Sequence, residues 1–102
     1  MEFSRDIFYI LDDRVPKSVD DFVKWSMWFW SNNQRVDSTI IGDVHISTVF
    51  LGIDTSPFGE PKLFETMVFG GKHHGYQRRC STWEQAAAQH VEAVALITGE
   101  LQ

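Results

Sequence analysis

The apolar residues of this chain follow two different spacings, which separate it into strands and helices. A short apolar run at residues 7–11 lies between acidic residues and is too short for a stable helix, so it predicts a strand. From Thr39 to Ile53 β-branched residues are frequent and apolar positions alternate, which predicts one long strand with both faces at least partly covered. Residues 62–69 and 76–80 predict two further strands, separated by segments rich in turn-forming residues.

The first helix is predicted to begin near Pro16, with Ser18 as its cap and Asp21 completing a capping-box pattern. The residues that share one face at helical spacing are Val19, Phe22, Val23, Ser26, Phe29 and Trp30. Trp25 and Trp28 fall away from the centre of that face, so this helix is apolar on more than one side.

The second helix is predicted to begin with a capping box between Ser81 and Glu84 and to end at Gly99. Its apolar stripe consists of Trp83, Ala86, Ala87, His90, Val91, Val94 and Ile97. The alanines of its first turns allow this helix to lie close against a sheet.

Together these elements predict an α+β fold. The strand segments are joined by loops too short for helical crossovers, which favours an antiparallel meander of three to four strands. We expect two helices packed on one face of this sheet, with Trp30 and Trp83 in the core. A chain of 102 residues can bury one core but not two, so residues 1–102 are predicted to form a single domain.

Aromatic residues are more numerous than a small core requires. The chain contains four Trp and eight Phe, so some aromatic surface should remain exposed for a partner or a ligand. Phe3, Trp25, Trp28 and Phe58 lie outside the predicted core stripes. We therefore expect a homo-oligomer, or a partner protein bound around Trp25 and Trp28 and their neighbouring acidic residues.

The net charge of −5 disfavours a protein that coats nucleic acid, because such binding depends on cationic side chains that release counterions. Cys80 is the only cysteine, so no intramolecular disulfide can form and a reducing compartment is expected. The chain has no apolar run of about 20 residues that would span a bilayer. We expect a cytoplasmic protein that does not associate with membranes.

A local group of cationic and aromatic residues, here called the basic cluster, stands out in this acidic chain. It comprises Lys72, His73, His74, Tyr76, Arg78 and Arg79. The two guanidiniums can grip a phosphate and the tyrosine can stack on a base, which makes all of these except His73 candidate ligand-binding residues. Neighbouring residues on a strand point to opposite faces, so Arg78 should share a face with Tyr76 and Arg79 with Gln77. The alternative is a solvated edge strand whose charges prevent aggregation.

Metal and catalytic chemistry have little support in the sequence. The histidines, Cys80 and Asp54 do not have the spacing of a known metal motif, so we expect neither a metal nor another cofactor. Cys80 and His90 could form a nucleophile pair, but no third residue is placed to orient the histidine. We expect Cys80 to be a structural thiol and the protein to have no catalytic residues.

Two acidic residues occupy positions that need a structural explanation. Glu65 lies inside an apolar strand, so it must either face solvent or be paired, and Arg78 on the next strand is the natural partner. Asp54 follows a strand and is expected to form an Asx turn.

Three segments of the chain form a recognisable set: Gly42–Asp54, Leu63–Gly71, and Tyr76–Ala86 together with His90. They resemble segments of a family of small proteins encoded by bacteriophages and prophages. This chain has His73-His74 where the similar proteins are more acidic, and Cys80 where they usually have an aromatic residue. The resemblance implies a viral origin, and small phage proteins often counter host defences.

From these observations we expect a phage-encoded binding protein, not an enzyme, that counters a host defence. One mechanism is sequestration of a small anionic, nucleotide-like signal by the candidate residues of the basic cluster. The other is inhibition of a host protein through the aromatic and acidic surface around Trp25 and Trp28.

Overall fold

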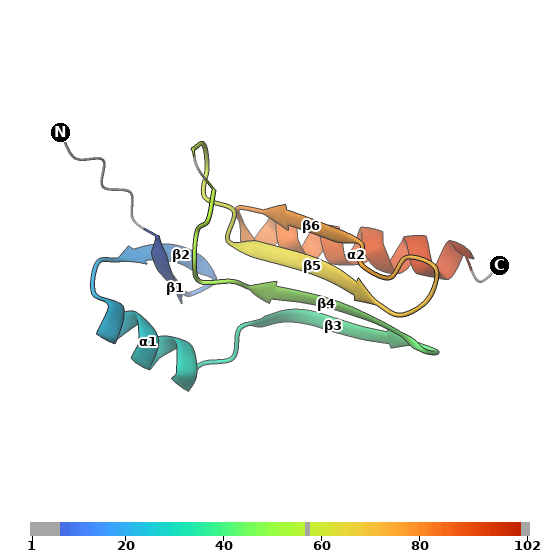
Figure 1. Cartoon of the computed structure of the whole chain (residues 1–102), viewed down its shortest axis with the longest axis horizontal. Helices are drawn as coiled ribbons and strands as arrows, with labels where there is room; N and C mark the ends of the chain where they lie inside the picture. Colours follow the sequence, from blue (N-terminus) through green and yellow to red (C-terminus); the bar gives the residue numbers. More distant parts are fainter. Residues whose placement is uncertain (1–6, 57, 101–102) are drawn as a thin grey trace.

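The chain folds into a two-stranded hairpin with a short helix, followed by a four-stranded antiparallel sheet that a long helix covers on one face (Figure 1). The computed structural model describes residues 7–56 and 58–100. The elements are β1 (Phe8–Asp12), β2 (Val15–Val19), α1 (Phe22–Ser31), β3 (Arg35–Ile41), β4 (Val44–Phe50), β5 (Phe64–Phe69), β6 (Gln77–Cys80) and α2 (Trp83–Glu100). The strand order of the larger sheet is β3-β4-β5-β6. The predicted α+β fold with an antiparallel meander is therefore confirmed.

The N-terminal hairpin corrects the predicted start of the first helix. Asp13 and Arg14 both have positive φ values, 52° and 71°, which is the backbone of a tight two-residue hairpin turn. Pro16 lies in β2, where a proline is tolerated because this strand has only one neighbouring strand. Asp21, and not Ser18, caps α1, since its carboxylate accepts a hydrogen bond of 2.8 Å from the backbone amide of Val23.

The prediction of one long strand between Thr39 and Ile53 is wrong, because two strands, β3 and β4, occupy this region. Gly42 has a φ of 57°, which allows a two-residue turn between Ile41 and Val44. The alternating pattern continues on both sides of this turn, so periodicity alone does not reveal it.

The buried face of α1 is centred on Trp25 and is rotated from the predicted one. Trp25 is only 7% exposed, and its indole nitrogen donates a hydrogen bond of 3.1 Å to the carbonyl oxygen of Tyr9 in β1. Trp30, which we expected in the core, is 82% exposed. The reason is that α1 packs mainly on the β1–β2 hairpin, with Trp25 stacked against Phe29 and lying beside Gly52.

Gly52 allows α1 to approach the chain that leaves β4. Its φ is +76°, and a Cβ atom added there would lie 3.2 Å from both the Phe29 ring and the Trp25 indole nitrogen. Trp28 reaches from α1 to the larger sheet, where its ring contacts that of Phe50 edge-on at 5.9 Å. These contacts connect the hairpin and α1 to the larger sheet.

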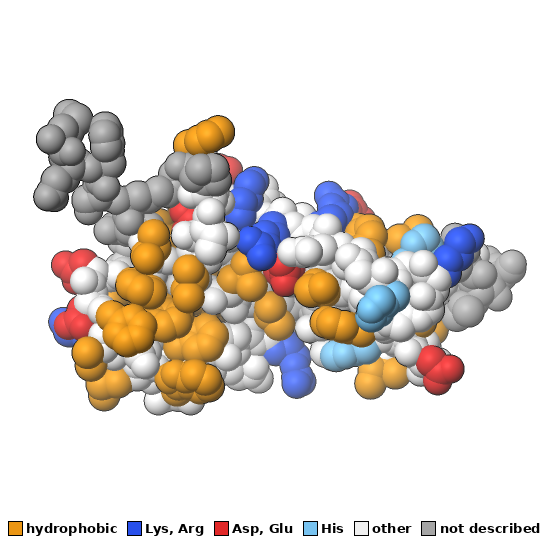
Figure 2. Space-filling model, viewed as in Figure 1, with side chains coloured by type: hydrophobic (Ala, Val, Ile, Leu, Met, Phe, Trp, Pro, Cys, Tyr) orange, Lys and Arg blue, Asp and Glu red, His pale blue; other side chains and the backbone are white. Residues whose placement is uncertain are grey.

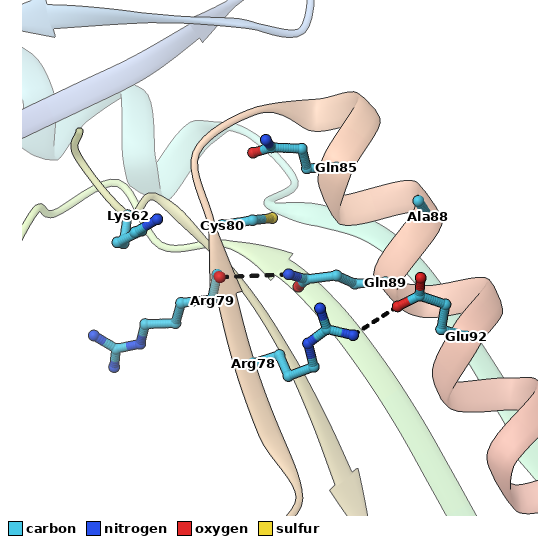
Figure 3. A pocket seen from close by; sticks show the side chains of 8 residues that line it. All are labelled: Lys62, Arg78, Arg79, Cys80, Gln85, Ala88, Gln89 and Glu92. Carbon is cyan, nitrogen blue, oxygen red and sulfur yellow. Dashed lines mark hydrogen bonds and ion pairs between the residues drawn. The ribbon is translucent and has the colours of Figure 1, made fainter.

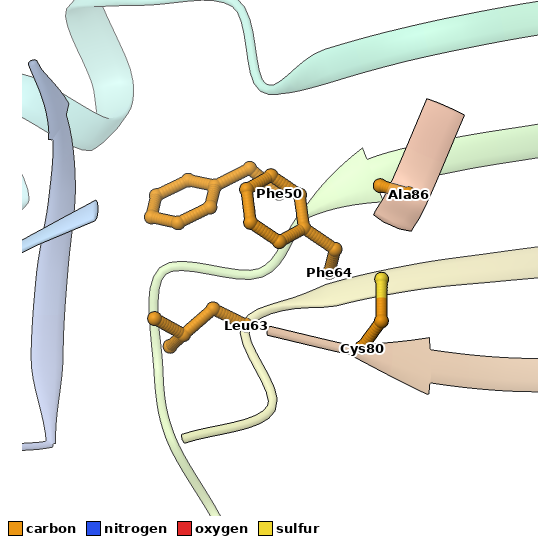
Figure 4. Close-up of a cluster of buried hydrophobic side chains, with 5 residues drawn as sticks. All are labelled: Phe50, Leu63, Phe64, Cys80 and Ala86. Carbon is orange, nitrogen blue, oxygen red and sulfur yellow. The ribbon is translucent and has the colours of Figure 1, made fainter. Parts of the chain in front are cut away.

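Helix α2 covers one face of the larger sheet and encloses the core. One cluster contains Phe50, Leu63, Phe64, Cys80 and Ala86 (Figure 4). Trp83 is half-buried and packs at the margin of this cluster. The other cluster contains Ile46, Val68, Ala93 and Ile97. Alternate residues of β4 and β5 thus point toward α2, as the sequence pattern predicts for strands.

The ends of α2 differ slightly from the predicted ones. The capping box lies between Thr82 and Gln85, one residue later than predicted: the Thr82 hydroxyl accepts from the Gln85 amide at 3.1 Å, and the Gln85 side-chain oxygen accepts from the Thr82 amide at 3.2 Å. Gly99 lies within the helix, which runs to Glu100. Val91, assigned to the apolar stripe, is 67% exposed.

A buried chain of polar side chains joins α2 to the sheet. His90 is 2% exposed, and its Nε2 and Nδ1 atoms lie 2.8 Å from the hydroxyl oxygens of Thr39 and Thr48 respectively. The Thr48 hydroxyl lies 2.8 Å from that of Thr66. Buried polar groups need such partners, so this network specifies how α2 sits across β3, β4 and β5.

Candidate functional site

The two arginines of β6 point to opposite sides of the sheet, as predicted. Arg78 pairs in register with Thr66, whose side chain is buried beneath α2, and its Nη1 atom lies 2.6 Å from a carboxylate oxygen of Glu92 in α2. Arg79 pairs in register with Glu65 on the face that α2 leaves uncovered, and its Nε atom lies 2.9 Å from that carboxylate. The expected partner of Glu65 was therefore wrong, because the register places Arg79 and not Arg78 opposite it.

Arg79 has a structural role in the sheet. The Glu65 side chain is only 12% exposed, and it also accepts a hydrogen bond from the Gln77 side chain. Arg79 donates in addition to the Thr55 hydroxyl at 3.2 Å, which connects β6 to the loop after β4. Arg79 thus compensates the charge of a largely buried carboxylate.

The remaining residues of the basic cluster do not form one site with both arginines. Lys72 and His74 are exposed in the turn between β5 and β6, where the His74 ring accepts a hydrogen bond of 2.8 Å from the Gly70 amide. Tyr76 is half-buried and packs against the Ile46 cluster, and its side chain hydrogen-bonds Arg78, with which it shares a face as predicted. The structure therefore divides the predicted ligand-binding residues between a turn, the core margin and two faces of the sheet.

A cleft with a volume of about 330 Å³ lies between β6 and the first half of α2 (Figure 3). Arg78 and Lys62 contribute cationic side chains to its lining, and α2 contributes Gln85, Gln89 and Glu92. Arg79 also borders the cleft, but its side chain points away from α2 in Figure 3. Among the predicted ligand-binding residues, Arg78 is the one whose charged group faces α2.

Gln89 is the residue of the cleft whose hydrogen bonds are incomplete. Its side chain is 8% exposed, and its amide nitrogen donates to the backbone carbonyl oxygen of Arg79 at 3.4 Å. Its side-chain oxygen is buried and has no hydrogen-bond partner among the described residues. A buried acceptor without a partner is costly, so a donor group that reaches this atom would be stabilising.

Sequence reasoning missed the α2 contribution to this cleft. Gln85, Gln89 and Glu92 have the i, i+4, i+7 spacing that puts residues on one side of a helix, and this was the available signal. No local pattern marks Lys62, which the loop before β5 brings to the same cleft.

The chemistry of Cys80 is that of a buried structural thiol, as expected. Cys80 is 5% exposed, and this burial raises the pKa of its thiol. The reactive form of cysteine is the thiolate, so a raised pKa works against nucleophilic catalysis. Both ring nitrogens of His90 are hydrogen-bonded to threonine hydroxyls.

Asp54 forms the expected Asx turn, and it is more buried than a surface turn requires. It is 3% exposed, and its Oδ1 atom accepts hydrogen bonds from the amides of Ser56 at 3.0 Å and Lys62 at 3.4 Å. Asp54 thereby holds together the two ends of the long loop between β4 and β5.

Apolar side chains gather at the hairpin end of the molecule (Figure 2), and several of them are exposed on α1. We call this exposed group the α1 outer face; its residues and exposed fractions are Phe22 58%, Val23 63%, Met27 67% and Trp30 82%. Trp25, predicted as a partner-binding residue, is buried behind this face, and Trp28 is half-buried against Phe50. Of the other aromatic residues expected at the surface, Phe58 is 80% exposed, and Phe3 lies outside the described residues.

The comparisons with known proteins do not assign a family. The chain matches no protein-family model, no curated protein and no solved structure. Within residues 7–56 and 58–100, no three His, Cys, Asp or Glu side chains gather as they would around a metal ion. The helices of this described part are too short or too polar to cross a membrane.

Substitution of the two arginines should separate their roles. We expect Arg79→Ala to lower the free energy of unfolding by about 1–3 kcal/mol, because it leaves the Glu65 carboxylate without its cation. Arg78→Ala should have a smaller effect, because Arg78 and Glu92 are both largely solvated. Urea denaturation of the two variants measures the difference. Equal losses would contradict the structural role of Arg79.

Proposed function

We propose that this protein is a non-enzymatic, phage-encoded binding protein that docks onto a host protein through the α1 outer face. In this proposal it acts in the host cytoplasm and counters a defence by blocking the protein that it binds. The observation that carries the proposal is the exposure of four large apolar side chains on a single ten-residue helix.

The energetic argument concerns a helix that is apolar on both sides. Trp25 and Phe29 anchor one side of α1 to the hairpin, while Val23, Met27 and Trp30 remain in water on the other. A helix that is hydrophobic all round is normally buried on all sides. Burying each of these exposed side chains contributes up to about 1.5–3 kcal/mol, which offsets part of the entropic cost of association.

The composition of the α1 outer face suits a protein interface. Tryptophan is enriched among the residues that dominate binding energy, and methionine adapts its shape to a partner surface. Trp30 projects from a helix that is held in place by the packing of Trp25, so little conformational order has to be gained on binding. The partner-binding role proposed for Trp25 and Trp28 thus passes to Met27 and Trp30.

The nature of the partner follows from charge and from the phage resemblance. The net charge of −5 favours a basic surface on the partner, because complementary charge accelerates association and disfavours other contacts. The resemblance of three segments to phage and prophage proteins supports a host protein as the target.

Variants of the α1 outer face provide the test. We expect the tagged protein to capture one host protein, and Trp30→Ser to weaken the complex with that purified protein by about 30-fold or more, as for a central interface tryptophan. Met27→Ser should weaken it less. Val23→Ser on this face and Val91→Ser on α2 form a matched pair, because the two valines are similarly exposed, at 63% and 67%. Val23→Ser should reduce the affinity, and Val91→Ser, the control, should leave it unchanged.

Sedimentation of the isolated protein distinguishes the host partner from a second copy of the chain. The predicted homo-oligomer would use the same apolar surface, so Trp30→Ser would convert it to a monomer. An oligomer that Trp30→Ser dissociates, together with no captured host protein, would show that the face serves self-association and would overturn host docking. Equal capture by wild type and Trp30→Ser would overturn any role of this face.

A further inference from the structure

The cleft between β6 and α2 combines cationic donors with an unsatisfied buried acceptor. Arg78 and Lys62 line it from the sheet side, and the side-chain oxygen of Gln89 lies in its α2 wall with no partner among the described residues. From this combination we propose that the cleft binds a small phosphorylated polyol, with the phosphate on Arg78 and Lys62 and a ligand hydroxyl donating to Gln89. This site lies away from α1, and its existence does not depend on the docking function.

The phosphate position follows from the donors of Arg78. The Arg78 guanidinium hydrogen-bonds the Tyr76 side chain, and its Nη1 atom forms an ion pair with Glu92 in which the two side chains are 47% and 59% exposed. A solvated pair of this kind contributes little stability, so a phosphate can share or replace the carboxylate. A guanidinium carries five N–H donors in a fork that matches phosphate oxygens, and Lys62 adds a second charge at the same cleft.

The hydroxyl position follows from Gln89. Its amide nitrogen donates to the Arg79 carbonyl oxygen, so its side-chain oxygen is the acceptor left for a ligand. That oxygen is buried, so the proposal requires a side chain of the cleft wall to move aside when the ligand binds. A residue that is 8% exposed cannot turn freely into solvent to satisfy this oxygen. A ligand hydroxyl removes the cost of the missing hydrogen bond, whereas a simple phosphate ion offers much less donor capacity.

The size and lining of the cleft select against polymers and favour a sugar over a base. Its volume of about 330 Å³ is at the lower end of small-molecule sites, about 300–1,000 Å³. The lining residues are Lys62, Arg78, Arg79, Cys80, Gln85, Ala88, Gln89 and Glu92, none of which carries an aromatic ring for base stacking. The small volume and the lack of aromatic rings in the lining favour the sugar-phosphate part of the nucleotide-like ligand predicted from the sequence.

The test is titration of the full chain with ribose 5-phosphate, inorganic phosphate and AMP, followed by amide chemical shifts and calorimetry. We expect ribose 5-phosphate to shift the amides of residues 78 and 89, and to bind more tightly than inorganic phosphate. Arg78→Gln should weaken this binding about tenfold or more, and Gln89→Leu about fivefold or more. Lys62→Gln provides a second measurement of the phosphate contact on an exposed side chain.

Arg35→Gln is the matched control, because it removes an exposed arginine from β3, at the opposite edge of the sheet from β6. It should leave the affinity within about twofold of wild type, given that exposed charges outside the site contribute little. Equal loss in Arg35→Gln and Arg78→Gln would show only a general charge effect and would overturn the site. Absence of shifts at residues 78 and 89 with every ligand would overturn it too.

Two further results would overturn the assigned ligand class. If inorganic phosphate binds as tightly as ribose 5-phosphate and Gln89→Leu has no effect, the cleft recognises an oxyanion alone. If AMP binds more tightly than ribose 5-phosphate, the base contributes binding that this cleft cannot explain. Capture of a host protein through Trp30 is measured separately, so failure here leaves the docking proposal unchanged.

Discussion

Replacing Phe64 by alanine should lower the free energy of unfolding by about 3–5 kcal/mol, the loss usual for a fully buried phenylalanine. Phe64 is 0% exposed, and the centroid of its ring lies 5.3 Å from that of Phe50 and 6.2 Å from that of Trp83. The cavity would lie where β4, β5 and the start of α2 meet. For a chain of this size the midpoint of thermal unfolding should fall by more than about 10 °C.

Phe69 provides a control on the same strand with the same side chain. It lies at the other end of β5, points to the opposite face and is 41% exposed. We expect Phe69→Ala to cost about 1 kcal/mol or less, as for surface substitutions. Phe64→Leu, which keeps most of the volume, extends the measurement if the alanine variant does not fold. Similar losses at residues 64 and 69 would contradict the burial that the structure assigns to this strand.

The stability of the protein should fall as the pH drops below about 6.5, the ordinary pKa of histidine. Burial lowers the pKa of His90 in the folded protein, and His45 acts in the same direction, while Asp37 opposes this shift. The unfolded chain therefore binds more protons than the folded protein below pH 6.5. The stabilisation from neutral His90 is complete above that pH and is lost as the pH falls toward its lowered folded pKa.

Thermal unfolding between pH 5 and pH 8 tests this dependence, with His90→Gln as the variant that cannot titrate. At pH 7 the substitution should cost about 1–3 kcal/mol, because the buried hydroxyl of Thr48 and the half-buried hydroxyl of Thr39 lose their partner. The variant should also lose part of the pH dependence seen in wild type. His74→Gln, in the exposed β5–β6 turn, controls for loss of a histidine. An unchanged pH profile in His90→Gln would show that His90 does not contribute.

The candidate cleft could be predicted from the sequence only in part. The strand alternation of Arg78 and Arg79 correctly placed their side chains on opposite faces. Register decided the rest: it set Arg79 opposite Glu65, and it put Arg78 beside Glu92 of α2. Side chains brought together by the packing of a helix on a strand have no fixed sequence separation, so no sequence motif indicates that they lie close together.

The outer face of α1 shows a different limit of sequence reasoning. A helix that is apolar on several sides has no unique hydrophobic stripe, so periodicity cannot decide which side is buried. Docking on the hairpin decided it, because Gly52 leaves room for Trp25 and the Tyr9 carbonyl accepts the indole hydrogen bond. The exposed Trp30 is the consequence of that choice.

The sequence by itself determined the α+β class, the antiparallel meander and part of the buried face of α2. These features rest on strict alternation in residues such as Ile46 and Phe64, and on a single apolar stripe that includes Ala86 and Ile97. Only the tertiary structure decided the turn at Gly42, the buried side of α1 and the residues that meet in the cleft. The physical reason is that periodicity is local, whereas register and the choice between equivalent faces depend on contacts between segments far apart in the chain.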